Sequence, residues 1–435
     1  MTRLLVAGAT AALLLAGCGG PPDVRQTGAG PQLPAIDQTL VPTIKVLSPT
    51  GWNGGTPTVP AGYRIAPFAT DLKVPRQMLV LPNGDLVVAE GKGGTDEPTL
   101  RPKDFIAGYI KSIGTTSVKG GDRLTLLRDA DGDGKPELRS VLIDRLDAPY
   151  GLALVGSELF VAEQGALLRF PYQTGQTQIA RTAGTLVAKL PSRVNHHWTK
   201  SLAASADGSK LYVGIGSNSN ITERGLAVEE DRARIWEIDR ATGEHRAYAT
   251  GVRNPTALAI NPWNQGLWAV ANERDEIGPR LVPDYLTSVR PGAFYGWPWS
   301  YYGQHVDPRV RPQNPAMVAI AQAPDYALGS HVAALGLAFS NGGAFGDGAF
   351  VGQHGSWNRS DPAGYKVVFV PFAGGRPAGQ PRDVVTGFLA DGKARGRPVG
   401  VAIDPRRPAL FVADHLSNTV WRVTPAAAPT RVASR

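Results

Sequence analysis

Residues 202–215 read LAASADGSKLYVGI: a short apolar stretch, a turn containing Asp207 and Gly208, and a second apolar stretch carrying Val213 beside a small residue. Apolar and β-branched residues on both sides of a Gly-containing turn are typical of a β-hairpin. The same pattern recurs along the chain from residue 61 onward. The further copies are residues 78–90, 151–163, 258–272, 337–353 and 401–414.

The spacing of these hairpins indicates the architecture. The central valines of the copies are Val88, Val161, Val213, Val270, Val351 and Val412, so the intervals are 73, 52, 57, 81 and 61 residues. Irregular hairpin repeats of this kind predict an all-β fold, a six-bladed β-propeller over residues 61–425, with long loop insertions in some blades. The alternative, an open β-solenoid, would need a shorter and stricter period.

The composition agrees with a β-rich body. The 435 residues include 52 Gly and 36 Pro, 42% are hydrophobic and 19% are charged. This excludes a coiled coil and argues against wholesale disorder. The net charge is +8, but the longest basic run is Arg406-Arg407. A nucleic-acid-binding protein would gather its positive charge on one face or segment, so no nucleic-acid partner is expected.

The N-terminus has the pattern of a targeting segment. Arg3 precedes an apolar stretch that ends in Leu15-Ala16-Gly17-Cys18, which resembles a bacterial lipobox. We expect residues 1–17 to be a signal peptide and Cys18, the only cysteine, to be lipidated; the alternative is an ordinary secretory signal with a chance Cys. The protein would then be lipid-anchored in a bacterial cell envelope and face the periplasm.

The ends of the chain flank the predicted propeller. Residues 19–60 hold eight Pro and seven Gly, a composition typical of a flexible or extended tether. We therefore predict a tether over residues 18–60, and a C-terminal tail over residues 426–435.

Residues that precede each repeat are the first candidates for a functional site. In a propeller the loops that enter the innermost strands meet at one end of the central channel, and loops on a rigid scaffold commonly carry function. These segments are 75–77, 149–150, 196–200, 253–256, 331–334 and 397–399. They bring bases, guanidinium groups and an amide to equivalent positions of different blades.

Two of these segments suggest specific chemistry. One histidine of the pair His196-His197 could act as a general base, because imidazole titrates near neutral pH; the alternative is a histidine bonded to the backbone. Arg253 and Arg397 suit a planar polyanion, since each can bind a carboxylate through two hydrogen bonds; the alternative is salt bridges between blades.

Two acidic stretches are candidate cation sites. Residues 272–276, beginning Asn272-Glu273, offer oxygen ligands of the kind that Ca²⁺ prefers. The loop with Asp129, Asp131 and Asp133 begins like an EF-hand loop, although Ser140 stands at its twelfth position and no flanking helices are evident. We favour a weak structural cation there, the alternative being a solvated acidic turn.

Longer strings of sequence resemble a known family. The chain is similar to the PQQ-dependent sugar dehydrogenases of the glucose/sorbosone dehydrogenase family, the sorbosone branch in particular, over roughly residues 61–425. The resemblance is carried by long co-linear stretches. They are NHHWTKSLAASADGSKLYVGIGSN (195–218), VRNPTALA (252–259), NERDEIG (272–278), GAFYGWPWSYYG (292–303), GQHGSWNRSDPAGYKVVFVPF (352–372) and GRPVGVAID (396–404).

The resemblance implies a six-bladed propeller that holds PQQ at the channel mouth, with Ca²⁺ against the quinone. It places His197 as the catalytic base and Arg253 and Asn254 as cofactor contacts. Arg397 matches one of two arginines that bracket PQQ, while Val399 stands where the second would be. Arg359 is the substitute for a lysine that has no clear match. Asn272 and Glu273 are the implied metal ligands.

The leading hypothesis is a periplasmic dehydrogenase that oxidises a sugar or aldose-like substrate and passes electrons to a respiratory acceptor. His197 would remove the hydroxyl proton as hydride passes to the quinone. A metal-dependent lactonase on the same architecture is an alternative, and it would need carboxylates such as Glu90 and Glu163 to converge on the channel. A non-catalytic carbohydrate- or protein-binding propeller is another.

Overall fold

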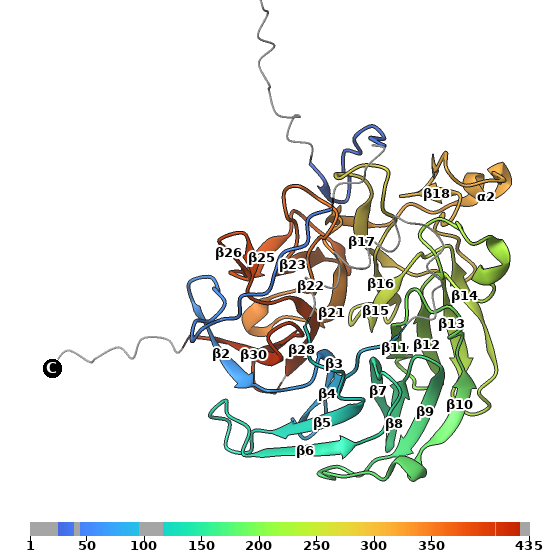
Figure 1. Cartoon of the computed structure of the whole chain (residues 1–435). Coiled ribbons are helices and arrows are strands. Elements are labelled where there is room, and N and C mark those ends of the chain that lie inside the picture. The colour runs from blue at the N-terminus through green and yellow to red at the C-terminus, as the bar shows by residue number, and fades with distance from the viewer. Residues whose placement is uncertain (1–24, 39–43, 95–115, 405, 427–435) are drawn as a thin grey trace, which may run out of the picture.

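Four-stranded antiparallel sheets are arranged around a central axis in the computed structural model, which describes residues 25–38, 44–94, 116–404 and 406–426 (Figure 1). The first three blades follow the chain without interruption. Blade 1 contains β3 (Pro75–Val80), β4 (Leu86–Glu90), β5 (Arg123–Arg128) and β6 (Leu138–Ile143). Blade 2 contains β7 (Gly151–Val155), β8 (Glu158–Ala162), β9 (Ala166–Pro171) and β10 (Thr185–Lys189). Blade 3 contains β11 (Lys200–Ala204), β12 (Lys210–Ile215), β13 (Arg234–Asp239) and β14 (His245–Thr250).

The last three blades contain additions or strands from distant parts of the chain. Blade 4 contains β15 (Pro255–Ile260), β16 (Leu267–Ala271), β17 (Pro283–Ser288) and β20 (Tyr326–Ser330), with β1 (Thr27–Gly28) as an outer fifth strand. Blade 5 contains β21 (Ala334–Ser340), β22 (Gly348–Gln353), β23 (Lys366–Ala373) and β25 (Arg382–Val385), and β24 (Arg376–Pro377) also pairs with β23. Blade 6 contains β28 (Pro398–Asp404), β29 (Ala409–Asp414), β30 (Thr419–Pro425) and β2 (Tyr63–Ala69).

The remaining elements lie in the connections. They are the hairpins β18 (Ser300–Tyr301) with β19 (His305–Val306) and β26 (Leu389–Ala390) with β27 (Lys393–Ala394), helix α2 (Pro315–Ile320), and 3₁₀ turns at Arg181–Ala183, Leu226–Glu229 and Gly343–Phe345. Among the described residues, no helix has the length and apolar character needed to cross a membrane.

The predicted six-bladed β-propeller is confirmed, and the repeat valines show why the pattern was informative. The innermost strands β3, β7, β11, β15, β21 and β28 contact one another in a closed ring. Each repeat valine lies on the second strand of its blade and is fully buried. An apolar cluster fills the space between each pair of neighbouring blades, including blades 6 and 1. The blades are therefore held together mainly by burial of apolar surface between sheets.

The described part of residues 18–60 lies against the propeller, which differs from the tether that its composition favoured. Thr27 pairs with Leu328 of blade 4, and Leu47 is buried against blades 5 and 6. The backbone N–H of Thr50 donates to Ala394 O at 2.9 Å. Pro and Gly here remove regular structure without removing contacts, because extended chain can still bond to sheet edges and loops. Residues 1–17, Cys18 and residues 427–435 lie outside the described residues.

Candidate active site

A cavity of about 320 Å³ opens where the loops entering the inner strands of blades 3 to 5 meet. We call it the His197 cavity. It is lined by His196, His197, Arg253, Asn254, Asn272, Glu273, Asp275, Asp284, His331, Ala333, Trp357 and Asn358. A smaller cavity of about 140 Å³ shares His197 and Asn254 with it and adds Arg76, Tyr150 and Trp198. The predicted gathering of loop residues from different blades is thus present.

His197 has the orientation and protonation state of a general base. Its Nδ1 lies 2.8 Å from Ser217 O, and a carbonyl oxygen can only accept, so Nδ1 carries the proton and Nε2 has a free lone pair. Burial lowers the pKa of His197 well below 6.5, with further lowering from His196 and Arg253. The ring is therefore neutral at neutral pH, as a base requires.

Tight packing fixes the backbone around this histidine. The Arg232 guanidinium donates from Nη2 to His197 O at 2.8 Å and from Nε to Gly216 O at 2.9 Å. A Cβ on Gly216 would lie 2.5 Å from both His197 Cβ and Asn254 Oδ1. Only glycine fits at that position, because real Cβ atoms do not approach so closely.

Arg253 lies at the site, but the protein itself occupies its donors. Its Nε and Nη2 donate to Asn220 O and Asn220 Oδ1 at 3.2 and 3.0 Å, and its Nη1 donates to Glu273 O at 2.7 Å. Nη2 also lies 3.4 Å from Asp275 Oδ2. In this structure Arg253 therefore holds the loop of residues 272–275 in place while also lining the cavity, and the cofactor contact that the resemblance implies for it stays a prediction.

Acceptor oxygens without hydrogen-bond partners surround the His197 cavity. Asn254 Oδ1, Asn272 Oδ1, Glu273 Oε1 and Asn358 Oδ1 are all buried, and none has a partner among the described residues. A buried acceptor oxygen without a hydrogen-bond donor costs free energy. A bound cation would interact with the lone pairs of these four oxygens and remove that cost. Ca²⁺ binds amide and carboxylate oxygens of this type. The predicted residues Asn254, Asn272 and Glu273 are brought together, and Asn358 joins them.

A carboxyl group behind this oxygen set has an unusual environment. Asp284 accepts from Glu273 N at 2.8 Å and from Ala333 N at 2.7 Å, which ties the loop after β16 to the loop after β20. Burial raises the pKa of Asp284 to about 7 despite these hydrogen bonds.

A second group of side chains, which we call the Arg76 cluster, is cationic. It consists of Arg76, Arg397, His354 and His415. The His354 and His415 rings stack at 4.7 Å with Nε2 of His354 3.1 Å from Nδ1 of His415, and Arg397 Nη1 lies 3.3 Å from His354 Nδ1. Burial lowers the pKa of both histidines well below 6.5, and the charges of Arg76 and Arg397 lower it further.

The two arginines of the Arg76 cluster lack carboxylate partners. Arg397 Nη2 donates to Tyr365 OH at 3.0 Å, and the Arg76 guanidinium lies 5.0 Å from the Trp198 ring centroid. Within the described part of the chain neither guanidinium pairs with an acid, and both Nε groups are buried without a partner. Buried cations normally need a counter-charge. A polyanionic ligand would supply one.

The structure does not bring Arg359 into the His197 cavity. Its Nη1 donates to Ser330 O at 3.2 Å and its Nη2 pairs with Asp361 at 2.6 Å. It lines a separate cavity of about 280 Å³ between blades 4 and 5. Sequence reasoning instead missed His354 and His415, although His354 stands in the quoted stretch GQHGSWNRS; Arg76 was placed at the mouth but given no role.

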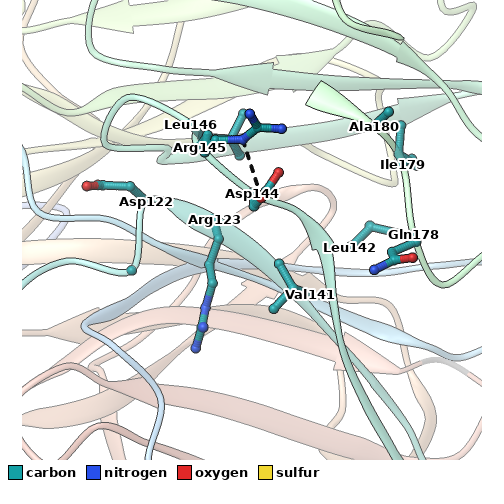
Figure 2. A pocket seen from close by; sticks show the side chains of 11 residues that line it. Asp122, Arg123, Val141, Leu142, Asp144, Arg145, Leu146, Gln178, Ile179 and Ala180 are labelled. Atoms are coloured by element: carbon teal, nitrogen blue, oxygen red, sulfur yellow. Dashed lines mark ion pairs between the residues drawn. The ribbon is translucent and has the colours of Figure 1, made fainter. Parts of the chain in front are cut away.

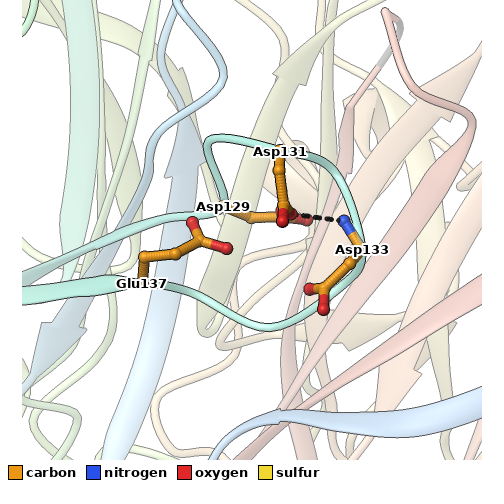
Figure 3. Close-up of side chains that lie close together, drawn as sticks. All are labelled: Asp129, Asp131, Asp133 and Glu137. Atoms are coloured by element: carbon orange, nitrogen blue, oxygen red, sulfur yellow. Dashed lines mark hydrogen bonds between the residues drawn. The ribbon is translucent and has the colours of Figure 1, made fainter.

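The acidic loop of residues 129–137 forms the predicted carboxylate cluster on the opposite end of the propeller. One carboxylate oxygen from each of Asp129, Asp131, Asp133 and Glu137 lies within 4.8 Å of the others (Figure 3). The loop also contacts Arg407 in the β28–β29 turn, at the far end of β28 from Arg397. Any cation held there would be structural, since it is separated from the His197 cavity by the length of the strands.

A larger groove and two acidic residues elsewhere in the propeller were also candidates for an active site, and neither has the features of the His197 cavity. A groove of about 860 Å³ beside blade 1 is larger than the His197 cavity, but its charged pair Asp144 and Arg145 is exposed and it contains no histidine (Figure 2). Glu90 at the end of β4 pairs with Arg123 on the neighbouring strand β5 at 3.1 Å, and Glu163 pairs with Arg181 in a 3₁₀ turn at 3.5 Å, so an arginine engages each carboxylate. Neither Glu90 nor Glu163, the carboxylates that the lactonase alternative named, lines the His197 cavity.

A family model described as TrAA12-like matches residues 57–283 and 309–426, which is most of the chain. The chain belongs to the TrAA12-like family. The resemblance to PQQ-dependent sugar dehydrogenases that the sequence showed is thereby confirmed at the level of the family, and the matched range leaves out residues 284–308 around β18 and β19.

Curated relatives match only in part. An uncharacterized protein of Borreliella burgdorferi is 28% identical over 240 residues, 52% of this chain and 60% of that protein. The aldose sugar dehydrogenase of Escherichia coli is 31% identical over 115 residues, 26% of each chain. The alignments thus span less than two thirds of these relatives.

Solved structures share the fold along almost their whole length. A Trichoderma reesei carbohydrate-active enzyme of family AA12 superposes with a TM-score of 0.69 at 19% identity, covering 89% of this chain and 100% of that one. The holo form of the pyranose dehydrogenase PQQ domain from Coprinopsis cinerea gives 0.68 at 20% identity, covering 87% and 100%. At such identities the likeness establishes the propeller.

Proposed function

We propose that this protein is a PQQ-dependent oxidoreductase that oxidises a sugar or an aldose-like substrate. The observation that supports this most strongly is the Arg76 cluster. Two guanidinium groups without acidic partners, the buried Arg397 and the half-buried Arg76, lie at the channel mouth that also holds the neutral base His197. PQQ is a planar tricarboxylate, which suits such a charge distribution. The named relatives, an aldose sugar dehydrogenase and a pyranose dehydrogenase PQQ domain, support the same chemistry.

Different residues of the site would bind the cofactor, hold the metal ion and accept the substrate proton. Arg76 and Arg397 would bind carboxylates of the cofactor, and Trp198 and Tyr150 beside Arg76 offer flat apolar surface. The oxygens of Asn254, Asn272, Glu273 and Asn358 would hold Ca²⁺. Bound PQQ supplies a two-electron acceptor, chemistry that no side chain provides. His197 Nε2 would take the proton from the substrate hydroxyl.

Binding of PQQ without turnover tests the proposal. Titration of the purified protein with PQQ and Ca²⁺, followed by absorbance and calorimetry, should give a saturable complex. Arg76→Met removes one charge-assisted interaction, of about 1.5–3 kcal/mol, so the Kd should rise about 10- to 150-fold. Arg145→Met is the matched control, because that guanidinium is 76% exposed and lies outside the cavity; its Kd should not change. Absence of any PQQ binding would refute the assignment.

The cellular setting is a separate part of the proposal. We propose that Cys18 is acylated, that the protein faces the periplasm and that a respiratory component receives its electrons; the lipobox-like Leu15-Ala16-Gly17-Cys18 supports this. Mass spectrometry of the membrane-extracted protein should find a mature N-terminus at Cys18 carrying lipid. An unmodified Cys18 would contradict the anchor while leaving the PQQ assignment intact.

A further inference from the structure

The neutral ring of His197 has two possible partners beside its Nδ1. Nδ1 lies 2.8 Å from Ser217 O and 3.1 Å from Ser217 Oγ. The carbonyl oxygen can only accept, but a hydroxyl can donate as well as accept. A Ser217 hydroxyl that donated to Nδ1 would favour the tautomer protonated at Nε2, and Nε2 could then not act as a base. The direction of one buried hydroxyl therefore bears on the state of His197.

The structure directs this hydroxyl away from the histidine. Ser217 Oγ lies 2.6 Å from Ser219 O, and a carbonyl oxygen can only accept, so the serine donates its proton there. The oxygen of Ser217 is then left to accept from His197 Nδ1. Both serines are fully buried, so bulk water does not compete for these bonds. The position of Ser219 O thus favours the tautomer of His197 that is protonated at Nδ1.

Glu229 holds Ser219 in this position. It ends the 3₁₀ turn Leu226–Glu229 between β12 and β13, and its side chain is buried. Its Oε1 accepts from Ser219 Oγ, and its Oε2 accepts from Asn218 N at 2.7 Å. Both donors belong to the two residues that directly follow Ser217. Because a buried carboxylate needs its hydrogen-bond donors, this arrangement fixes the backbone of residues 218–219.

The same β12–β13 connection holds the histidine from its backbone side. Arg232 donates from its backbone N–H to Glu229 O at 3.0 Å, and its guanidinium donates to His197 O. Burial is the largest influence on Glu229 and raises the pKa of its carboxyl group, whereas its hydrogen bonds and the charges of Arg232 and His196 lower it. One loop therefore positions both the backbone and the ring proton of His197.

We propose that Glu229 is a positioning residue that keeps His197 in the tautomer protonated at Nδ1, acting through Ser219 and Ser217. Without Glu229 the loop loses its hold on Ser219 O, and the Ser217 hydroxyl becomes free to turn and donate to Nδ1. Part of the protein would then carry the ring proton on Nε2, where it blocks the lone pair that takes the substrate proton. The inference rests on the proposed role of His197 as the base, but the tautomer can be measured without PQQ, Ca²⁺ or substrate.

Nitrogen NMR of the imidazole ring tests this proposal. The protein would be produced with isotopically labelled histidine, and the His197→Gln spectrum identifies which of the seven histidines is His197. At neutral pH the wild-type protein should show a protonated Nδ1 and an unprotonated Nε2. Glu229→Ala should move the ratio of the tautomers about tenfold toward the Nε2–H form, the effect of about one net hydrogen bond. Glu229→Gln keeps the shape and one acceptor oxygen, so it should give a smaller shift in the same direction, and it carries the test if Glu229→Ala does not fold.

Two further variants distinguish an effect on the tautomer from a general loosening of the fold. Glu90→Ala is the matched control, because Glu90 is also a buried acid that accepts one backbone N–H and one hydroxyl; it should leave the His197 signals unchanged. Adding Ser217→Ala to either Glu229 variant removes the hydroxyl that would donate to Nδ1. This second change should restore the Nδ1–H form, which no purely structural role of Glu229 would produce.

Three results would overturn the proposal. They are a wild-type tautomer in both Glu229 variants, an equal shift in Glu90→Ala, and a combined variant in which the Nδ1–H form is not restored. None of these measurements involves the cofactor. A protein that shows the expected tautomers but binds no PQQ would refute the proposed function and leave the link between Glu229 and the ring of His197 intact.

Discussion

Individual buried histidines couple this protein's stability to pH. Burial lowers the pKa of His354 and His415 well below 6.5, while the unfolded chain titrates near 6.5. Below pH 6.5 the two imidazole rings therefore bind protons in the unfolded state but stay neutral in the folded state, so the free energy of unfolding falls as the pH falls. Each such histidine contributes up to about 1.4 kcal/mol of lost stability per pH unit.

Variants that lack these histidines should differ from the wild-type protein in how their free energy of unfolding depends on pH. Replacing both residues, His354→Asn/His415→Asn, should flatten the decline in urea-unfolding free energy between pH 7 and 5.5, whatever its value at pH 7. His305→Asn, at an exposed position on β19, should leave the wild-type slope unchanged. If the double variant keeps that slope, the two rings are not neutral in the folded protein.

At the same scale, sequence could identify some site residues and not others. His197 and Arg397 were found because they precede inner strands, a position that the repeat pattern reveals directly. Arg359 was misplaced because its neighbours in sequence, Trp357 and Asn358, do line the His197 cavity, while its own side chain turns toward Ser330 and Asp361. One residue's difference along a loop reverses the direction of a side chain, and no sequence pattern records that direction.

At the scale of an element, the β5–β6 turn is expected to bind Ca²⁺. Its clustered carboxylates repel one another unless a cation or their hydrogen bonds offset the repulsion. Gly132 N and Gly134 N bond Asp129, and each of the other three carboxylates also accepts one backbone N–H of the turn, with the acids pointing inward (Figure 3). A ligand that binds only the folded turn stabilises the fold.

Millimolar Ca²⁺ should therefore raise the Tm of the wild-type protein more than that of Asp131→Asn/Asp133→Asn. Asp207→Asn, in the β11–β12 turn, is a matched control because its carboxylate also bonds local turn groups. The difference between variants isolates the turn, since the oxygen set of the His197 cavity is the same in all of them. Identical Ca²⁺ shifts in all the proteins would show that the turn is only a solvated acidic loop.

At this scale the sequence predicted the β-hairpins, but it did not predict that residues 44–60 lie against the propeller. Each repeat buries its own valine, so the alternation of apolar strands and Gly turns is a local property of the sequence. Leu47 and Thr50 instead contact residues more than 300 positions away, at Ala394 and its neighbours. Composition can describe a segment's flexibility in isolation, but it does not reveal a distant surface on which the segment lies.

For the whole molecule, the decisive contact is the one that closes the ring. β2, near the N-terminus, pairs with β30, near the C-terminus, through Ile65 and Val423 among others. β2 therefore supplies the outer strand of blade 6, whose other strands come from the end of the chain. Phe68 and Ala69 of β2 are buried in the cluster between blades 6 and 1. The first and last parts of the chain thus depend on each other.

Two truncations separate this closure from the contacts of residues 25–60. A chain starting at residue 61 keeps β2 and should unfold cooperatively, with a lower Tm because Leu47 and the bonds to Ala394 are lost. A chain starting at residue 71 lacks β2, leaves the edge of β30 unpaired and exposes the cluster that contains Phe68. Exposed edges of this type favour pairing between molecules, so the shorter chain should aggregate or lose its cooperative transition. Circular dichroism melting and size-exclusion chromatography would show both effects. A monomeric chain from residue 71 with the Tm of the chain from residue 61 would mean that the inner-strand ring holds without closure by β2.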